Sequence, residues 1–400
     1  MRAAGLGLLV ATAATAICEP VTFYKDVLAI LQNRCQTCHR PGEIGPMPLR
    51  TYAETRPWAK AIRQAVLLRR MPPWSADPRF GLFRNDLSLS ATEIDTLKAW
   101  VDTGAAAGDP ATAPPVPPSV EGWRIPKPDV VFQMPQEFEA PSSGVIDYQY
   151  FSVPTHFTED RWVQMAEVRP GDRSIVHHAI VMINDPTPDP WHAGRQYLAG
   201  YAPGMSPQTW PDGQARLIRA GSYLTFQMHY TANGKARRDR TRIGLVFAKS
   251  PPKERIVAMT ASHYWLEIPP GASDYSVDSS TTLYQPARLV GMRAHMHLRG
   301  KSFEFRVVSP GSEPQVVLRI PKYSFDWQPY YYLEKPVALP AGSRIECTAV
   351  YDNSSNNPHN PDPTAEVHWG EQSWDEMMIG WFDVAVPVDR AVRNHPLALE

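Results

Sequence analysis

The pattern of hydrophobic and polar positions divides the chain into a short helical part followed by a long part rich in strands. A first helix is predicted over residues 22–34, where apolar side chains recur at the three- and four-residue spacing of one helix face. A second is predicted to begin at Ser90, which forms a capping box with Glu93, and to end at Gly104. The apolar face of this second helix consists of Ile94, Leu97, Trp100 and Val101.

Strand patterns dominate after residue 129. Short runs rich in β-branched and aromatic residues alternate with Gly, Pro, Asn and Asp turns. Many short strands with little helical periodicity favour antiparallel sandwich or jelly-roll architecture, and this length of chain suits two such sandwiches. We predict them over residues 129–254 and 255–390. Examples of the predicted strands are 148–153, 162–168, 175–183, 222–230, 243–248, 287–292, 302–308, 315–319, 344–351 and 379–386.

Composition adds a boundary between the two parts. The 400 residues include 41 prolines, and a dense group of them lies in residues 107–128. Such a segment favours an extended, semi-rigid polyproline spacer, so we predict a linker there. The net charge of −1 provides no field that would attract nucleic acid or an anionic membrane, and neither is expected as a partner.

The N-terminus has the pattern of an export signal. A basic residue precedes a short apolar run, and Ala14-Thr15-Ala16 forms an Ala-x-Ala cleavage site. We therefore predict a signal peptide over residues 1–16 and an exported protein, periplasmic or extracellular. The apolar run is too short to span a bilayer, and no later segment is apolar enough to do so. A lipid anchor at Cys18 is the less favoured alternative, because the preceding residues make a poor lipobox.

A C-x-x-C-H motif, Cys35-Gln36-Thr37-Cys38-His39, directly follows the first predicted helix. Two thiols at this spacing can add to the two vinyl groups of one haem, while the adjacent imidazole becomes an axial iron ligand. A thioredoxin-like redox pair would need a βαβ context, and half a zinc site would need a second cysteine pair. The sequence has neither, so we predict one covalently bound haem c in a domain spanning residues 17–106.

The second axial ligand of this haem has two candidates. Met71 and Met47 are each followed by proline, in Met-Pro-Pro-Trp and Met-Pro-Leu respectively. The helix predicted from Ser90 resembles the C-terminal helix of class I cytochrome c domains, and that resemblance implies a methionine followed by prolines in a loop. Core packing is the commoner fate of methionine and remains an alternative for both. We favour Met71, because it lies farther from His39 and lets the chain wrap the haem.

Histidines in the strand-rich part supply a second candidate site. His295 and His297 are two residues apart in a segment with a β-type pattern, so their side chains are expected to point to the same face. Such a pair is either exposed or half of a transition-metal site, with copper and zinc the favoured ions. His177 and His178 are adjacent and would face opposite ways in a regular strand, so they share a metal only where the strand is distorted. His229 lies in Gln-Met-His-Tyr.

Taken in order, these motifs resemble a known family. His-His, Gln-x-His-Tyr, His-x-His and Asp-Glu-Met occur in this order over residues 129–387. The set resembles the copper type II, ascorbate-dependent monooxygenases, the family of peptidylglycine α-hydroxylating and dopamine β-monooxygenases. The segment Tyr323–Gln328 also recurs there in similar form. The resemblance implies two packed β-sandwiches that each bring one copper ion.

Carried onto this chain, the resemblance implies two unequal copper sites. An all-imidazole site can shuttle one electron with little rearrangement, whereas two imidazoles and a thioether favour Cu(I) and leave positions open for dioxygen. The electron-transfer copper would be held by His177, His178 and His229, and the dioxygen-binding copper by His295, His297 and Met377.

The sequence departs from that family at several positions. The animal enzymes have a disulfide-bonded cysteine after the methionine ligand, but here Met378 stands in its place, so Cys347 is expected as a buried thiol. Arg293 matches a carboxylate-binding arginine of the peptide-amidating enzyme, whereas two further substrate contacts are replaced by Ile379 and Trp381. Arg293 and Trp381 are candidates for lining a substrate pocket, with core packing the alternative for Trp381.

These features predict an exported copper-dependent monooxygenase that hydroxylates a C–H bond of a small organic substrate with O2. The fused haem would supply electrons one at a time to the His177, His178 and His229 copper, in place of ascorbate or a separate redox protein. The Pro-rich linker would raise the effective concentration of the haem near that site. The alternative is a copper- and haem-containing electron-transfer or sensing protein without catalytic activity.

Overall fold

The computed structural model describes residues 19–116, 122–186, 195–202 and 204–388. The predicted signal peptide and Cys18 therefore lie outside the described residues. The chain forms two compact units, one drawn from Met1–Pro72 and Leu89–Pro117, the other from Pro73–Ser88 and Pro118–Glu400. Residues 73–88, which fall inside the sequence-assigned range 17–106, belong to the second unit.

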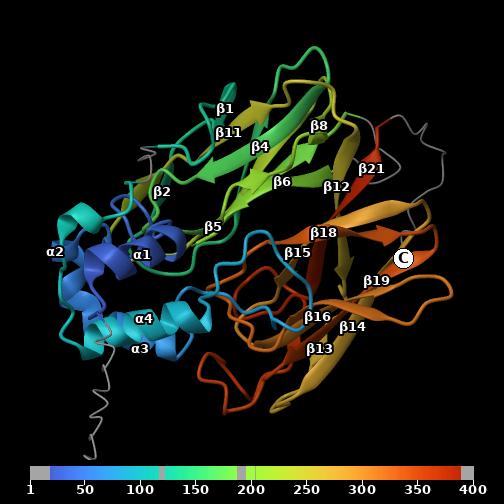
Figure 1. Cartoon of the computed structure of the whole chain (residues 1–400). Coiled ribbons are helices and arrows are strands. Elements are labelled where there is room, and N and C mark those ends of the chain that lie inside the picture. The colour runs from blue at the N-terminus through green and yellow to red at the C-terminus, as the bar shows by residue number, and fades with distance from the viewer. Residues whose placement is uncertain (1–18, 117–121, 187–194, 203, 389–400) are drawn as a thin grey trace, which may run out of the picture. The chain divides into compact units, whose positions relative to one another are not determined.

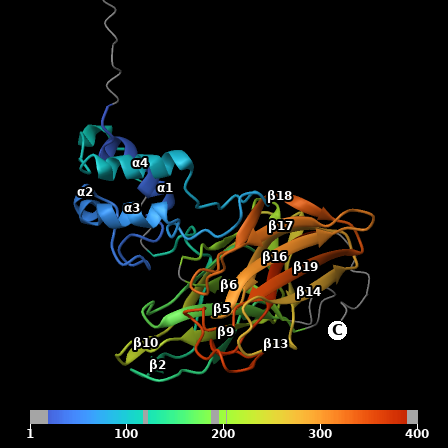
Figure 2. The ribbon, with the colours of Figure 1, turned by 90° about the horizontal axis from the view of Figure 1, so that it is seen from below.

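The first unit is a small helical domain. Its core is built by apolar faces of short helices, with Phe23, Leu31, Leu97 and Trp100 fully or almost fully buried. Helices α3 and α4 lie side by side (Figures 1 and 2). The helices of this unit are η1 Phe23–Val27, α1 Leu28–Arg34, α2 Tyr52–Thr55, η2 Arg56–Trp58, α3 Ala59–Leu67, α4 Ala91–Asp102 and η3 Pro110–Thr112.

Both helices predicted from the sequence are present in this unit. Residues 22–34 form one turn of π-helix, η1, that continues into α1. The predicted capping box is confirmed, because the Ser90 side chain accepts from the backbone N–H of Glu93 and the Glu93 carboxylate accepts from the backbone N–H of Ser90. Gly104 has a φ of +100°, which favours glycine and ends the helical segment.

The second unit is made of strands. All ten strands predicted from the sequence are present, with boundaries displaced by at most three residues. The strands are β1 Val130–Gln133, β2 Phe138–Ala140, β3 Gln149–Pro154, β4 Arg161–Arg169, β5 Val176–Asn184, β6 Arg195–Tyr201, β7 Gln208–Thr209, β8 Gln214–Ile218, β9 Tyr223–Tyr230, β10 Arg237–Asp239, β11 Arg242–Phe247, β12 Glu254–Ser262, β13 Glu267–Ile268, β14 Tyr275–Leu283, β15 Ala287–His295, β16 Gly300–Val308, β17 Gln315–Ile320, β18 Tyr331–Leu339, β19 Ser343–Tyr351, β20 Val367–His368 and β21 Ile379–Pro387.

One long sheet runs through the whole β unit. Its strand order is β1-β11-β4-β8-β12-β21-β15-β18, with β7 paired to β4. Two four-stranded sheets, β3-β9-β5-β6 and β14-β19-β16-β17, complete the two halves. The strands of the first half are drawn from teal through green to dark yellow, and those of the second from dark yellow through orange to red (Figure 1). Each half buries its own apolar core, one around Phe226 and Leu245 and the other around Phe305 and Phe382.

The junction between the halves differs from two separate antiparallel sandwiches. Strands β8 and β12 pair in parallel, with Gln214 opposite Glu254 and Ala215 opposite Arg255. This pair lies where the sequence places the boundary, at residues 254–255, and it makes the two halves share one continuous sheet. The halves are thereby held side by side through backbone hydrogen bonds.

Residues 73–88 cover the edge of β18, the last strand of the long sheet. Phe83 forms an isolated antiparallel bridge with Leu333, and the Arg84 N–H donates to the Tyr332 carbonyl at 3.0 Å. The Asn85 amide donates to the Tyr330 carbonyl at 2.6 Å and accepts from the Tyr332 N–H at 3.0 Å. Exposed edge strands present unpaired backbone groups, so this segment satisfies groups that would otherwise face solvent.

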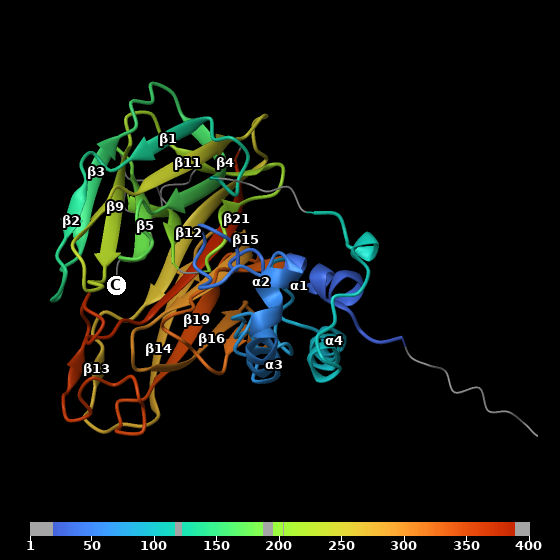
Figure 3. The same cartoon turned by 90° about the vertical axis from the view of Figure 1, so that its left-hand side faces the viewer.

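Among the described helices, none combines the length and the apolar composition that crossing a bilayer requires. Figure 3 shows the short helices of the first unit.

Candidate metal centre

Five histidines from three strands gather in the second unit. His177 and His178 lie near the start of β5, His229 near the end of β9, and His295 ends β15 with His297 just beyond it. Strands β5 and β9 are antiparallel neighbours, and His178 lies directly opposite His229 in their register. The site is therefore assembled by strand pairing between segments that are far apart in sequence.

A local irregularity turns both adjacent histidines toward the same place. The register of β5 on β9 shifts between Val176 and His178, so one residue of β5 is left without a direct partner. A bulge of this kind re-aims side chains that would otherwise alternate. Adjacent histidines in a regular strand would face opposite ways, so this bulge is the distortion that lets His177 and His178 share one ion.

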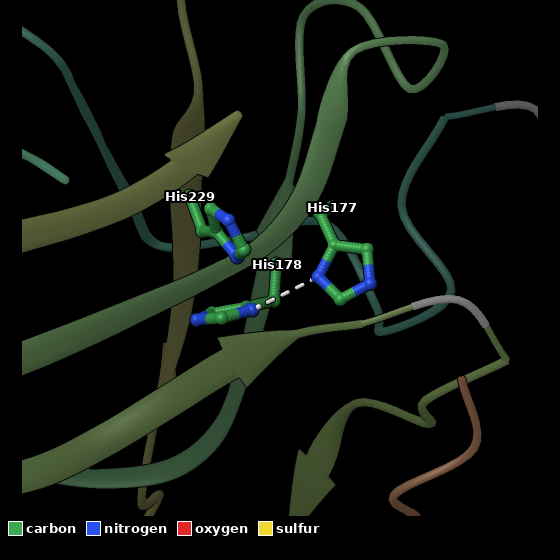
Figure 4. Close-up of side chains that lie close together, drawn as sticks. All are labelled: His177, His178 and His229. Carbon is green, nitrogen blue, oxygen red and sulfur yellow. Dashed lines mark hydrogen bonds between the residues drawn. The ribbon is translucent and has the colours of Figure 1, made fainter. Parts of the chain in front are cut away.

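The three imidazoles from β5 and β9 converge (Figure 4). One ligand nitrogen from each of His177, His178 and His229 lies within 4.8 Å of the others. The Nδ1 atoms of His177 and His178 are 3.2 Å apart, as the dashed line shows. Three nitrogen donors at these separations fit a single transition-metal ion, with copper and zinc both suited to imidazole.

His229 gives the clearest sign that something binds here. Its side chain is 8% exposed, and its Nδ1 atom has no hydrogen-bond partner within the described part of the chain. A buried ring nitrogen without a partner carries a desolvation cost that a metal ion would remove. The residues present therefore fit a bound metal.

Tyr148 orients two of these rings. Its ring stacks on His229 with centroids 4.8 Å apart and planes 15° apart. Its hydroxyl lies 3.3 Å from His178 Nε2. When His178 Nε2–H donates to this hydroxyl, the lone pair of His178 lies on Nδ1, which is the nitrogen that faces His177. Hydrogen bonding at the far nitrogen is the usual way in which a ligating imidazole is fixed.

Hydrogen bonds at Nδ1 also orient the second histidine pair, His295 and His297. The Nδ1 atom of His295 lies 2.7 Å from the Oε1 atom of Gln328, and that of His297 lies 3.2 Å from the carbonyl oxygen of Asp375. Both partners are acceptors, so each Nδ1 donates a proton and each Nε2 keeps its lone pair. Both imidazoles can therefore ligate an ion through Nε2.

The segment that contains Met377 wraps around His297. The Glu376 carboxylate, which is fully buried, accepts from the backbone N–H groups of His297 at 2.7 Å and Arg299 at 2.6 Å. Met377 follows it and is half-buried, and the Tyr351 hydroxyl donates to its carbonyl at 2.9 Å. Strand β21 then begins at Ile379, which pairs with His295. The backbone thus brings residues 375–377 beside the second histidine pair.

Burial keeps all five imidazoles neutral. It is the main cause that lowers the pKa of His229 to about 3 and that of His297 to about 4, and the neighbouring imidazole of His177 contributes to both shifts. Burial also lowers the pKa values of His177, His178 and His295. A neutral imidazole has a lone pair for a metal, so protons do not compete for these nitrogens at neutral pH.

The two histidine groups are in contact with one another. The rings of His178 and His295 have centroids 6.5 Å apart. Phe325 lies between the groups, stacked on His177 at 5.0 Å and edge-on to His297 at 5.7 Å. Phe325 and Gln328 belong to the loop between β17 and β18, so one loop contacts a ligand candidate of each group.

A small cavity opens beside these histidines, with Arg293 in its lining. Arg293 is 5% exposed and its Nε atom has no hydrogen-bond partner. Its guanidinium lies over the rings of Tyr197 and Trp381, at 5.1 and 5.6 Å. Within the described residues Arg293 forms no ion pair, so a buried cation without a carboxylate adjoins the cavity. The other lining residues near the site are His177, His178, His295, Phe325 and Gln328.

The C-x-x-C-H residues lie at the end of α1 in the helical unit. Cys35 and Cys38 are not joined in a disulfide, and burial raises the pKa of the Cys35 thiol to about 12. His39 Nδ1 lies 3.1 Å from the Met47 carbonyl oxygen, which leaves Nε2 available to an axial position. A Cβ at Gly45 would lie 2.8 Å from His39, so only glycine allows this close approach. The donor set fits covalent haem attachment.

Sequence reasoning missed the residues that orient the histidines. Tyr148 carries no motif, and its role depends on the pairing of β3, β5 and β9. Phe325 and Gln328 lie in the Tyr323–Gln328 segment, for which the sequence provides only a resemblance and no role. Cys347 is fully buried in β19 and in no disulfide, as expected.

The comparisons with known proteins bear on one part of the chain. No curated protein matches it. Solved structures with some likeness include the infectious bursal disease virus T13 particle, at 7% identity over 66% of this chain and 71% of that chain with a TM-score of 0.21. The VP2 subviral particle of the same virus has 9% identity over 70% of this chain and 76% of that chain, with a TM-score of 0.21. These TM-scores carry no argument about fold or function.

One family model matches within the second half of the β unit. It covers residues 256–381, which include His295, His297 and Met377. It is the model of the C-terminal domain of copper type II ascorbate-dependent monooxygenase, so residues 256–381 are similar to that domain.

Proposed function

We propose that the protein is an exported copper monooxygenase that hydroxylates a C–H bond of a small organic substrate, with electrons supplied through a haem on the same chain. The observation that carries this proposal is the pair of histidine groups at one cavity, each with its imidazoles neutral and oriented. The match to a copper monooxygenase domain over residues 256–381 supports it. The export signal at residues 1–16 stays a prediction.

The two histidine groups would hold copper in different ways. His177, His178 and His229 supply three imidazoles, and Tyr148 holds two of them in place. His295 and His297 supply two imidazoles, to which Met377 would add a thioether. Bound copper supplies one-electron redox chemistry at the first group and dioxygen activation at the second.

The cavity beside His295 would bind the substrate. Arg293 presents a buried cation without a carboxylate partner, so a substrate with an anionic group would be stabilised there. Trp381 and Tyr197 flank this guanidinium and hold it toward the cavity. Neither ring is among the residues that line the cavity, so the predicted pocket role of Trp381 is limited to its contact with Arg293.

The haem would be attached through Cys35 and Cys38, with His39 as one axial ligand. The Met47 carbonyl hydrogen-bonds His39 Nδ1, the nitrogen that points away from the iron. With His39 as one ligand, Met47 would be occupied beside that imidazole, and another residue would have to supply the second ligand. This argument supports Met71 as the second ligand.

The test is a turnover experiment with labelled dioxygen. The protein is loaded with copper, reduced through its haem or with ascorbate, and supplied with ¹⁸O₂ and small substrates that do or do not carry a carboxylate. We expect one ¹⁸O atom in a hydroxylated product and none with the His297→Ala variant. His359→Ala, an exposed histidine outside the site, is the matched control. Dioxygen consumption without labelled product for every substrate would contradict the proposal.

A further inference from the structure

We propose that a clamp between the two halves of the β unit couples ion binding at the two histidine groups. The clamp consists of two side-chain pairs, Tyr150 with Glu371 and Asp147 with Gln372. The inference rests on the proposed function, because it takes both histidine groups as metal sites. It adds four positioning residues, which act through the loop that supports His297.

The backbone pairing that joins the two halves lies far from the histidines. Strand β12 pairs with β8 of the first half at Glu254 and Arg255, the residues with which β12 begins. At the other end of β12, Ser262 pairs with Ile379 of β21, and Ile379 pairs with His295. The nine residues of β12 extend over about 26 Å, at about 3.3 Å per residue. Side-chain contacts therefore decide how closely the halves lie at the histidine end.

On the first half, the clamp lies next to the residues that orient His229. Tyr150 is two residues beyond Tyr148, whose ring stacks on His229, and it pairs with Gln227 of β9. The Gln227 amide donates to the Tyr150 hydroxyl at 2.8 Å, and this hydroxyl donates onward to the Glu371 carboxylate at 2.7 Å. Burial raises the pKa of Tyr150, and the hydrogen bond to Glu371 adds to this effect. The hydroxyl therefore keeps the proton that it donates to Glu371.

The second pair of the clamp connects the same two segments. The Gln372 amide donates to the Asp147 carboxylate at 3.1 Å, and Asp147 directly precedes Tyr148. Glu371 and Gln372 are consecutive, so both pairs fasten one short loop, between β20 and β21, to the first half. In each pair the acceptor is a carboxylate, and hydrogen bonds to a charged acceptor are stronger than those between neutral groups.

The loop that carries Glu371 and Gln372 is closed at its base. Trp369 forms an isolated parallel bridge with Glu376. The Glu376 N–H donates to the His368 carbonyl at 3.1 Å, so the two ends of the loop are held together by backbone contacts. A loop closed in this way shifts as one piece.

The same loop supports the second histidine group. The Asp375 N–H donates to the Gln372 carbonyl at 3.0 Å, and the Asp375 carbonyl lies 3.2 Å from His297 Nδ1. The Glu376 carboxylate accepts from the backbone N–H of His297, and Met377 is the next residue. The clamp therefore positions the second group relative to the first.

Coupling between the two groups follows from this connection. An ion that fixes the imidazoles of one group also fixes the clamp residues beside it. The other group then loses less conformational freedom when it binds its own ion, which raises its affinity. Repulsion between two cations opposes this effect, but the repulsion does not depend on the clamp. Removing the clamp should therefore lower the coupling and leave the repulsion unchanged.

The experiment measures Cu(II) affinity of the full-length chain by competition with a chelator. The affinity of the second group is measured twice, once with Cu(II) at the first group and once in a chain whose His177, His178 and His229 are all replaced by alanine. The ratio of the two affinities is the coupling factor. Paramagnetic resonance shows which group is occupied at each step. If the triple variant does not fold, the factor is measured at the first group instead, after alanine replacement of His295 and His297, because linkage requires the same value.

The variants break the hydrogen bond between Tyr150 and Glu371. Tyr150→Phe removes the donor and Glu371→Ala removes the acceptor, so each should lower the coupling factor about three- to tenfold. Glu371→Gln keeps an oxygen that accepts from Tyr150 and should keep most of the factor. Tyr223→Phe is the matched control for Tyr150, because Tyr223 begins β9 and is 44% exposed, against 46% for Tyr150. Glu366→Ala, which removes an exposed carboxylate just before β20, is the control for Glu371→Ala.

Equal coupling factors in the wild type, Tyr150→Phe and Glu371→Ala would overturn the clamp, even if both variants bind Cu(II) more weakly at each group. An equal fall of the factor in Tyr223→Phe or Glu366→Ala would overturn it too. The clamp and the proposed function fail separately. A factor that depends on the clamp, without labelled product from ¹⁸O₂, would refute only the monooxygenase function. Labelled product with unchanged factors would refute only the clamp.

Discussion

His178 and His229 lie directly opposite each other on β5 and β9, immediately after the bulge that re-aims His177. This relationship joins two segments about fifty residues apart in sequence into one donor set. The pair has no carboxylate partner that would favour protonation, and burial keeps both rings neutral. The buried His178 and His229 pair is stable when it binds an ion that accepts the imidazole lone pairs, or when the pH is high enough for both rings to stay neutral.

The apo protein should become less stable in mild acid because of His229. Burial lowers its folded-state pKa to about 3, below the unfolded value of about 6.5, so the unfolded state binds more protons. Stability is therefore full above pH 6.5 and is lost as the pH falls toward 3. At pH 5.5 the linkage costs about 1.4 kcal/mol. Chelated wild type and His229→Gln should be compared by thermal unfolding at pH 7.5 and 5.5. An equal loss in both proteins would contradict the prediction.

Gln328 should control the second histidine group without being a ligand. It holds His295 through Nδ1 at 2.7 Å, so Gln328→Ala frees that ring to rotate. Loss of such a partner typically weakens metal binding by about 10- to 100-fold. Competition with a chelator measures the affinity, and the copper on His177, His178 and His229 should be unaffected. The control is Gln164→Ala. Gln164 lies in β4, and its amide donates to the Asp212 carboxylate. Equal affinities in the two variants would rule out the role of Gln328.

Met377 should separate dioxygen chemistry from copper binding at the first group. Met377→Ala removes the proposed thioether and should abolish dioxygen activation, because two imidazoles alone favour Cu(I) less. The paramagnetic resonance signal of the all-histidine copper should persist unchanged. If both copper signals disappear together, the two sites are not independent. An enzyme that keeps its full rate without Met377 would exclude the thioether as a ligand.

Asn85 should stabilise the β unit by completing its edge. Its amide satisfies the Tyr330 carbonyl and the Tyr332 N–H of β18, at 2.6 and 3.0 Å. Asn85→Ala leaves two edge groups unpaired and should lower the free energy of unfolding by roughly 1–3 kcal/mol. Asn85→Asp keeps an oxygen that accepts from the Tyr332 N–H, so it should lower the free energy of unfolding by about half as much. Chemical denaturation measures both, and a change below about 0.5 kcal/mol for Asn85→Ala would contradict this role.

Most of the fold follows from local patterns in the sequence. The ten predicted strands show turn residues at their ends and β-branched or aromatic residues within, so their positions depend little on tertiary context. Several other strands are not among these ten; in β12, for example, nearly all residues are buried, which removes the alternation that marks a half-exposed strand. The pairing of β8 with β12 is a long-range parallel contact that no local pattern reveals.

The sequence predicts the candidate ligands of the site, but not the residues that orient them. Motif order singled out His177, His178, His229, His295 and His297, and ring contacts in the structure join them into one group. The bulge in β5, the stacking of Tyr148 on His229 and the position of Phe325 all depend on how strands and loops pack. Likewise, residues 73–88 look like part of the helical domain in sequence, because their partners on β18 are some 250 residues away.

Metal analysis combined with paramagnetic resonance tests the central claim most directly. Wild-type protein purified after copper loading should contain two copper ions and one iron atom per chain. A triple His177→Ala, His178→Ala, His229→Ala variant should keep one copper with the signal of the His295 and His297 site, and a double His295→Ala, His297→Ala variant should keep the other. A wild type that binds a single copper ion, or variants that lose both ions together, would contradict the account of two copper centres.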